Sequence, residues 1–267
     1  TIIIGKYSGF CEGVKHTIQE AEKYVKEKKK VYCLGELVHN ERVINNLESQ
    51  GMITVESLTD IPPSSYTIFR AHGEKKEQYE KAKKKNLKIL DLTCGKILAI
   101  RKMIEKAKND SFILMIGKKN HPETIGTMSY VENNKAIIED IEEIPNIVNI
   151  INHSSKEKVL IIAQTTFSSS KFDIITKSLK QKCYKEIKIN KTICKATENR
   201  QNETKELAKK VNVVIIIGGK NSSNTKELYN IAKEENHNTI MIQSIDDLTE
   251  YIPNKNEIIG IMAGAST

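Results

Sequence analysis

Three of the five cysteines in this 267-residue chain begin the same short pattern. Each lies between an apolar or β-branched run and a stretch typical of a helix, namely Cys11 in GFCEGV, Cys94 in DLTCGK and Cys194 in TICKAT. A second apolar run then ends in a polar cluster, 27 or 28 residues after the cysteine, at His39, His121 and Asn221. A third apolar run ends 61, 71 and 72 residues after the cysteine, at His72, Thr165 and Ser266. A spacing that occurs three times predicts three similar units with one cysteine each.

The three cysteines predict a metal or cluster site. Three equivalent units around an axis would bring three thiolates together, and three ligands from distant segments leave a fourth coordination position open. Thiolates favour zinc, copper(I) or iron–sulfur clusters, and the residues alone leave this choice open. No C-x-x-C pair supports a zinc knuckle or a thioredoxin-like motif. We interpret the other two cysteines, Cys33 and Cys183, as structural.

The polar clusters predict a pocket for a small anion beside the thiolates. Three histidines lie at the ends of predicted strands and could donate hydrogen bonds to phosphate: His39, His72 and His121. The third copy has hydroxyls and an amide at a predicted helix start, at Ser222, Ser223 and Asn224, where backbone N–H groups bind anions. The remaining histidines, at positions 16, 153 and 237, lie outside the pattern, and we interpret them as surface or structural residues.

Glu123 is the candidate general acid. It lies two residues after His121, in the stretch HPET. A carboxyl group near three thiolates and several phosphate oxygens would have a raised pKa, because like charge disfavours ionisation. It could then donate a proton near neutral pH. The alternative is a glutamate of a first helical turn, stabilised only by the helix dipole.

The amino-acid composition favours some classes of binding partner over others. The net charge of +8 favours an acidic partner protein or an anionic substrate. Nucleic-acid binding has little support, because tryptophan is absent and aromatic residues are few. An odd cysteine count argues against a disulfide framework, and no long apolar span indicates a membrane protein.

Strand and helix patterns alternate along the whole chain, which predicts an α/β fold. We expect three similar small α/β domains with parallel-rich sheets, in a pseudo-threefold arrangement around a central cavity that holds the cluster: residues 1–90, 91–188 and 189–267. The strands are rich in Ile and Val and barely alternate, as parallel strands covered on both faces do. Each polar cluster follows the carboxyl end of a strand, where open α/β sheets bind ligands.

Nine stretches in order resemble one family: GFCEGV, VHNERV, RAHGE, DLTCGK, HPETIGT, AQTTFS, TICKATENRQ, GGKNSSN and AGAST. The chain resembles the 4-hydroxy-3-methylbut-2-enyl diphosphate reductases, the LytB or IspH family, from residue 9 to residue 267. The resemblance implies reductive dehydroxylation of this allylic diphosphate to isopentenyl and dimethylallyl diphosphate. This is the last step of the non-mevalonate isoprenoid pathway.

The resemblance also implies roles for the candidate residues. Cys11, Cys94 and Cys194 would hold a 4Fe–4S cluster, found as 3Fe–4S when oxidised, and two electrons would pass through it. Glu123 would relay protons, and Thr165 would order the substrate hydroxyl. The diphosphate would be held or enclosed by His39, His72, His121, Ser222, Ser223, Asn224 and Ser266. Two departures from the family are Gly95-Lys96 after the second cysteine and Thr124, where Val is usual.

Two other functions remain alternatives. One is a non-redox hydro-lyase that uses a cluster without net electron transfer, and the other is a metal- or cluster-binding sensor. For the reductase, we expect a small acidic electron donor of the ferredoxin type, and neither a membrane nor a nucleic acid as partner. The Lys, Asn and Ile content, and a start inside a predicted strand, suggest a plastid-type organelle, apicoplast-like, after removal of a transit peptide. A bacterial enzyme would instead be cytoplasmic.

Overall fold

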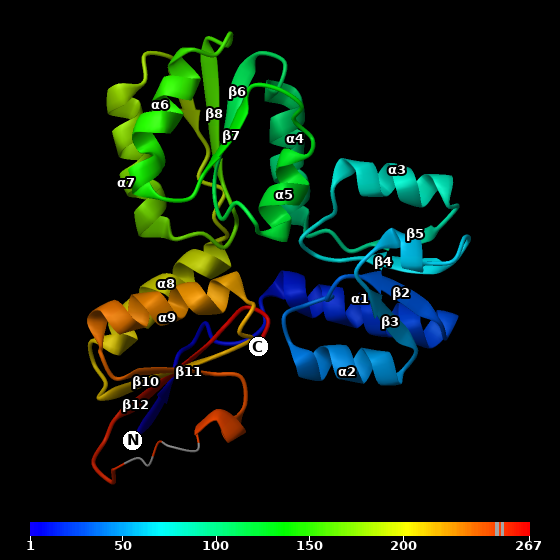
Figure 1. The fold of residues 1–267 in the computed structure, drawn as a ribbon. Helices are drawn as coiled ribbons and strands as arrows, with labels where there is room; N and C mark the ends of the chain where they lie inside the picture. Colours follow the sequence, from blue (N-terminus) through cyan, green and yellow to red (C-terminus); the bar gives the residue numbers. More distant parts are fainter. Residues whose placement is uncertain (249–250, 252–253) are drawn as a thin grey trace. The chain divides into compact units, whose positions relative to one another are not determined.

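The computed structural model describes residues 1–248, 251 and 254–267, which contain three four-stranded sheets (Figure 1). The first sheet, in spatial order, contains β3 (Met52–Val55), β2 (Val31–Leu34), β4 (Tyr66–Phe69) and β5 (Lys88–Asp91). The second contains β7 (Lys135–Ile138), β6 (Ser111–Ile116), β8 (Lys158–Ala163) and β9 (Glu186–Ile189). The third contains β11 (Thr239–Ile242), β10 (Val213–Ile217), β12 (Ile259–Ala263) and β1 (Ile2–Ile4). Within the sheets, strands whose register is defined pair in parallel, which confirms the predicted α/β class.

The three sheets share one strand order. The last strand in each order lies at the edge of its sheet, beside β4, β8 or β12. In the sequence, each of these edge strands precedes a repeat cysteine: β5 precedes Cys94, β9 precedes Cys194 and β1 precedes Cys11. The first strand of the chain therefore pairs with β12, with Ile2 opposite Ile259. This pairing joins residues at the two ends of the sequence, which a local pattern cannot reveal.

The described chain forms two compact units. One contains Thr1–Lys29, Glu36–Met52 and Cys194–Thr267, and the other contains Lys30–Gly35 and Ile53–Ile193. The three predicted domains, 1–90, 91–188 and 189–267, stay a prediction.

The helices follow the strands closely. They are α1 (Glu12–Lys28), α2 (Glu41–Ser49), α3 (Lys76–Lys84), α4 (Gly95–Ala107), α5 (Pro122–Met128), α6 (Ile144–Asn152), α7 (Ser169–Lys182), α8 (Lys195–Ala208) and α9 (Ser223–Glu235). In the described part of the chain, no helix is both long enough and apolar enough to cross a membrane.

The second sheet is buried on both faces. Every residue of β6 is buried, and successive side chains point to opposite faces. Phe112 and Leu114 pack with residues of α6 and α7, whereas Ile113 and Met115 pack with residues of α4 and α5. This arrangement explains why the strand reads as a continuous apolar run.

Several elements lack a clear sequence pattern. Helix α3 is almost entirely charged and polar, and Ala82 is its only buried residue. Helix α6 is apolar but only nine residues long, with Pro145 in its first turn. Strands β3 and β7 have four residues each. Short or highly charged elements depend on tertiary packing, so their sequences carry little periodicity.

Candidate functional site

The three repeat cysteines occupy the same local position. Each immediately precedes a helix, at the N-terminus of α1, α4 and α8: Cys11, Cys94 and Cys194. The Cys11 sulfur accepts a hydrogen bond from the backbone N–H of Val14 at 3.5 Å. Backbone N–H groups in a first helical turn stabilise negative charge, so this position suits a thiolate.

Backbone hydrogen bonds tie two of these cysteines to strand ends. The N–H of Cys94 donates to the carbonyl of Ala71 at 3.0 Å, just after β4. The N–H of Cys11 donates to the carbonyl of Ala265 at 3.1 Å, just after β12. The local backbone of the two repeats is therefore equivalent, as the regular spacing predicts.

Arg200 is a buried cation near two of the cysteines. It is 4% exposed, and its guanidinium donates to the carbonyls of Gly9 and Ala196. Burial lowers the pKa of Arg200, and negative charge on Cys11 and Cys194 opposes that shift. The thiols of Cys11 and Cys194 thus share a positive neighbour within one unit.

No disulfide joins any of the five cysteines, all of which lie in the described part of the chain. Among residues 1–248, 251 and 254–267, no group of three His, Cys, Asp or Glu side chains is placed to hold a metal ion. Cys11 and Cys194 belong to one compact unit and Cys94 to the other. The donor set itself, three thiols at matching helix starts, has the chemistry that iron–sulfur clusters take.

Glu123 is a buried carboxyl in the first turn of α5, with 1% exposed. Thr165 holds both of its oxygens: the backbone N–H donates to Oε1 at 2.6 Å, and the hydroxyl donates to Oε2 at 2.7 Å. Burial raises the pKa of Glu123 to about 7, although the two hydrogen bonds from Thr165 lower it. A group that titrates near pH 7 can exchange a proton under physiological conditions.

A pair of histidine rings lies at the start of α5, the helix that contains Glu123. His121 caps α5, and its Nδ1 accepts a hydrogen bond from the Glu123 N–H at 3.1 Å. The ring of His72 meets that of His121 edge to face, with centroids 5.5 Å apart. The structure therefore brings together His72, His121, Glu123 and Thr165 in one unit.

Matching turns follow the third strand of each copy. The N–H of Gly73 donates to Arg70, that of Phe167 to Gln164 and that of Thr267 to Gly264. When the three turns are aligned on these hydrogen bonds, the residues that precede Gly73, Phe167 and Thr267 are equivalent: His72, Thr166 and Ser266. Thr165 instead matches Ala71 and Ala265, one residue earlier. Sequence spacing could have found Thr166, because it lies 72 residues after Cys94, as Ser266 does after Cys194.

The third copy has a buried amide where the second has a carboxyl. Ser222 caps α9 as His121 caps α5, so Asn224 matches Glu123 as the second residue of its helix. Asn224 is 3% exposed, and among the described residues neither its oxygen nor its nitrogen has a hydrogen-bond partner. Ala265, which stands where the second copy has Thr165, has no hydroxyl to offer. The amide is left available for a ligand.

Ser266 is held near the start of α2. The side-chain N–H of Asn40 donates to the carbonyl of Ser266 at 2.9 Å, and its oxygen caps α2 by accepting from Val43. His39 precedes this cap, and its Nδ1 lies 3.1 Å from a Glu36 oxygen. A side chain at Gly219 would place its Cβ 2.5 Å from the His39 carbonyl, so only glycine fits this close approach.

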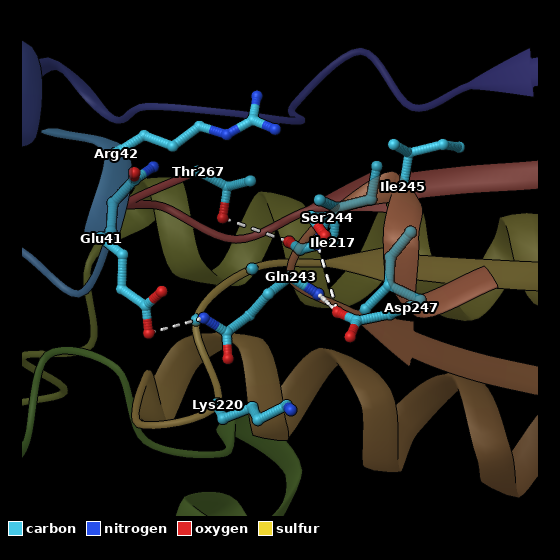
Figure 2. A pocket seen from close by; sticks show the side chains of 13 residues that line it. Glu41, Arg42, Ile217, Lys220, Gln243, Ser244, Ile245, Asp247 and Thr267 are labelled. Atoms are coloured by element: carbon cyan, nitrogen blue, oxygen red, sulfur yellow. Dashed lines mark hydrogen bonds between the residues drawn. The ribbon is translucent and has the colours of Figure 1, made fainter. Parts of the chain in front are cut away.

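A cavity of about 670 Å³ adjoins these residues, at the carboxyl ends of β10 and β11 (Figure 2). Gln243 and Glu41 face one another across it, with Nε2 to Oε1 at 3.3 Å. Asp247 accepts hydrogen bonds from the backbone N–H groups of Gln243 and Ser244, which closes its own loop. The lining includes both Lys220 and Asp247, so its charge is mixed.

The residues assigned no role lie where structural residues belong. Cys33 is fully buried inside β2, and Cys183 ends α7 and packs on the core of the second sheet. The three histidines outside the pattern are exposed: His16, His153 and His237.

The sequence pattern of the LytB protein family matches residues 2–267. The chain belongs to the LytB family. This confirms the resemblance, which rested on cysteine, histidine and NSSN motifs spread over the whole chain. The chain is accordingly an enzyme.

Named relatives agree with this assignment. The 4-hydroxy-3-methylbut-2-enyl diphosphate reductase of Aquifex aeolicus is 38% identical over 270 residues, which are 100% of this chain and 91% of that protein. The reductase of the same name from Petrotoga mobilis is 38% identical over 272 residues, 100% of this chain and 92% of the relative.

Two solved structures share the fold. The E-1-hydroxy-2-methyl-but-2-enyl-4-diphosphate reductase of Plasmodium falciparum has a TM-score of 0.90 and 32% identity, over 100% of this chain and 83% of that one. The second, an (E)-4-hydroxy-3-methyl-but-2-enyl diphosphate reductase described as the terminal enzyme of the non-mevalonate pathway, has a TM-score of 0.69. It is 36% identical, over 100% of this chain and 94% of that one.

Proposed function

We propose that this chain is a 4-hydroxy-3-methylbut-2-enyl diphosphate reductase, which converts this allylic diphosphate to isopentenyl and dimethylallyl diphosphate. One observation carries the proposal beyond family membership. The buried Glu123, whose carboxyl is held by Thr165 in the helix that His121 caps, has a pKa of about 7. A proton donor of this kind is what removal of a hydroxyl as water requires.

Cys11, Cys94 and Cys194 are our proposed ligands of a 4Fe–4S cluster. Their equivalent positions at the starts of three helices support this assignment. When bound, the cluster would pass two electrons from the donor to the substrate and would offer a Lewis-acidic iron. An anaerobic preparation should contain about four iron and four acid-labile sulfide per chain, or three of each after oxidation to 3Fe–4S. A preparation that contains zinc and no acid-labile sulfide would indicate a site without redox chemistry, and this result would contradict the proposal.

Glu123 is the proposed proton donor to the leaving hydroxyl. Its protonated form dominates below its pKa of about 7, so the acid is available at neutral pH and below. Thr165 holds the carboxyl in place with two hydrogen bonds and presents its own hydroxyl at the same point. The substrate takes up two electrons and two protons in total: the carbon–oxygen bond breaks as the oxygen takes one proton and leaves as water, and the second proton adds to carbon.

The proposed diphosphate-binding residues provide N–H and O–H donors. Asn224 is the strongest structural candidate, because both polar atoms of its buried side chain lack partners among the described residues. The others are His39, His72, His121, Ser222, Ser223 and Ser266. We add Thr166 to this set, because it occupies the same position in its turn as His72 and Ser266 do in theirs.

The proposed electron donor is a small acidic protein of the ferredoxin type, which the net charge of +8 would attract. Turnover driven by such a donor should fall steeply as salt screens this attraction. Turnover with a small uncharged reductant should not, and equal salt dependence for both would contradict the prediction.

The compartment stays a prediction. Relatives named above are bacterial, and one similar solved structure comes from Plasmodium falciparum. An apicoplast-like plastid would apply to a source with that organelle, and the cytoplasm to a bacterium. Immunolocalisation in source cells would distinguish them.

An anaerobic assay separates the three functional classes. Wild-type protein, reconstituted with iron and sulfide, is given the allylic diphosphate with and without a chemical reductant. A reductase forms the two products only with reductant. A hydro-lyase would consume substrate without it, and a sensor would not turn over in either condition.

A further inference from the structure

Arg101 is a buried cation in α4. It lies seven residues after Cys94 on the same helix and is 8% exposed. One guanidinium nitrogen donates to the carbonyl of Glu74 at 2.8 Å, and another donates to the hydroxyl of Tyr79 at 3.3 Å. Its planar fork therefore reaches two points of the segment that follows β4.

The turn from Arg70 to Glu74 is seated on this guanidinium. Gly73 has a φ of +71°, and a Cβ there would lie 2.3 Å from an Arg101 nitrogen. On the other side, a Cβ at Gly126 of α5 would lie 2.9 Å from the Gly73 carbonyl oxygen. The turn is thus held between α4 and α5, and it carries His72.

The same guanidinium contacts the segment after α5. It lies over the ring of Tyr130, 4.6 Å from the centroid, as a cation–π contact. Helix α5 begins at His121 and contains Glu123. One side chain therefore links the helix that starts at Cys94, the turn that carries His72 and the helix capped by His121.

We propose that Arg101 is a positioning residue that sets the geometry of the His72–His121 pair and, through it, the affinity for the diphosphate. The edge-to-face contact of the two rings depends on the turn being seated against α5. A lysine cannot replace the fork, because its single ammonium cannot bond Glu74 and Tyr79 while lying flat on Tyr130. The inference rests on the proposed function, because it assumes that these histidines bind the substrate.

The test compares Arg101→Lys and Arg101→Met with Ile104→Val, a matched control. Ile104 is fully buried on the same helix and packs on the second sheet, so this change reduces stability without touching the turn. Each protein is prepared anaerobically with its cluster. The measurements are kcat, KM for the allylic diphosphate, melting temperature, and ¹⁵N-histidine NMR spectra without substrate.

We expect KM to rise about tenfold in Arg101→Met and less in Arg101→Lys, while kcat changes less than about threefold. Histidine signals of His72 and His121 should shift, and that of His39 should not. Ile104→Val should lower the melting temperature and leave KM and these signals unchanged. If Arg101→Met does not fold, Arg101→Lys decides the question.

Wild-type KM and unshifted histidine signals in Arg101→Lys and any folded Arg101→Met would overturn the inference. So would a KM change that Ile104→Val reproduces, because that would be a general effect of stability. Absence of turnover in the wild type is a different result. It would refute the proposed function itself, whatever the spectra of the variants show.

Discussion

Two equivalent helix starts in this molecule have opposite polar chemistry. Glu123 and Asn224 are each the second residue of a helix, and they are 1% and 3% exposed. Thr165 donates hydrogen bonds to both oxygens of the carboxyl, whereas Ala265, which matches Thr165 in the equivalent turn, has no hydroxyl. The buried carboxyl of Glu123 suits proton exchange, whereas the buried amide of Asn224 suits hydrogen bonding to a ligand. A repeated backbone could thus support the two proposed roles through single changes of side chain.

Removing the acid should have the largest effect. Glu123→Gln keeps the shape of the side chain but has no proton to donate, so kcat should fall by about 10²–10⁴-fold. In the wild type, kcat should decline as pH rises above about 7, because the acid loses its proton there. The variant should lack this pH-dependent decline.

The matched control is Glu142→Gln, an exposed glutamate of the same unit. Its kcat and pH profile should equal those of the wild type. Retention of full activity by Glu123→Gln would show that another group supplies the proton.

The raised pKa of Glu123 should also make the free energy of unfolding depend on pH. The folded-state pKa of Glu123, about 7, lies above the model-compound value of 4.5. Its contribution to stability is therefore complete below pH 4.5 and is lost as pH rises through 7, about 3 kcal/mol in total. Between pH 5.5 and 8 the loss should be about 2 kcal/mol, and Glu123→Gln should be free of it. Urea unfolding at the two pH values measures the difference, and equal pH dependence in both proteins would rule out a raised pKa.

Asn224→Ala should separate binding from stability. Loss of an amide that binds a charged group weakens binding by about 1.5–3 kcal/mol, so KM should rise by about 10- to 100-fold. The melting temperature should stay the same or rise, because an unsatisfied buried amide is removed. A lower melting temperature with unchanged KM would mean that the amide is structural.

The reciprocal change tests the comparison directly. Ala265→Thr offers Asn224 the hydroxyl that Thr165 offers Glu123. We expect a smaller rise in KM, because the amide is then partly satisfied within the protein. An unchanged KM would show that position 265 does not control the availability of Asn224.

Thr165→Val should move the pH profile in a known direction. It removes the hydroxyl bond to Oε2 but keeps the backbone N–H bond to Oε1. Because the lost bond lowers the pKa of Glu123, the decline in kcat should move to higher pH. The maximal kcat should fall by less than about tenfold. A shift to lower pH would contradict the role of this hydroxyl.

The smallest effect is expected at two matching threonines. Thr124 and Thr225 are fully buried, and among the described residues their hydroxyls have no hydrogen-bond partner. Thr124→Val and Thr225→Val should raise stability by up to about 1 kcal/mol, with kcat unchanged. Thermal unfolding measures this, and a loss of stability would indicate a partner such as an ordered water.

Much of the architecture could be predicted because it depends on local pattern. Helix α1 can be recognised from the sequence, since its apolar residues recur at steps of three and four and lysines follow its last buried position. Charged α3 and short β7 could not be predicted, because packing stabilises them more than their own residue preferences do. Repeat spacing nominated the cysteines and histidines as site residues, which stays a prediction. It matched Thr165 with Ser266, whereas the hydrogen-bonded turns match Thr166 with Ser266.

The amino-acid sequence was enough for the family and the α/β class, and it nominated the residues of the candidate site, because motifs and periodicity are local properties of the chain. The tertiary structure was needed for three further facts. It joins β1 to β12 across the whole chain, it brings Thr165 to Glu123 over 42 residues, and it seats the His72 turn on Arg101. Each of these facts depends on which groups, distant in the sequence, come into contact when folding buries them. Burial of a carboxyl with its donors, or of an amide without them, then decides which group titrates and which is left to bind.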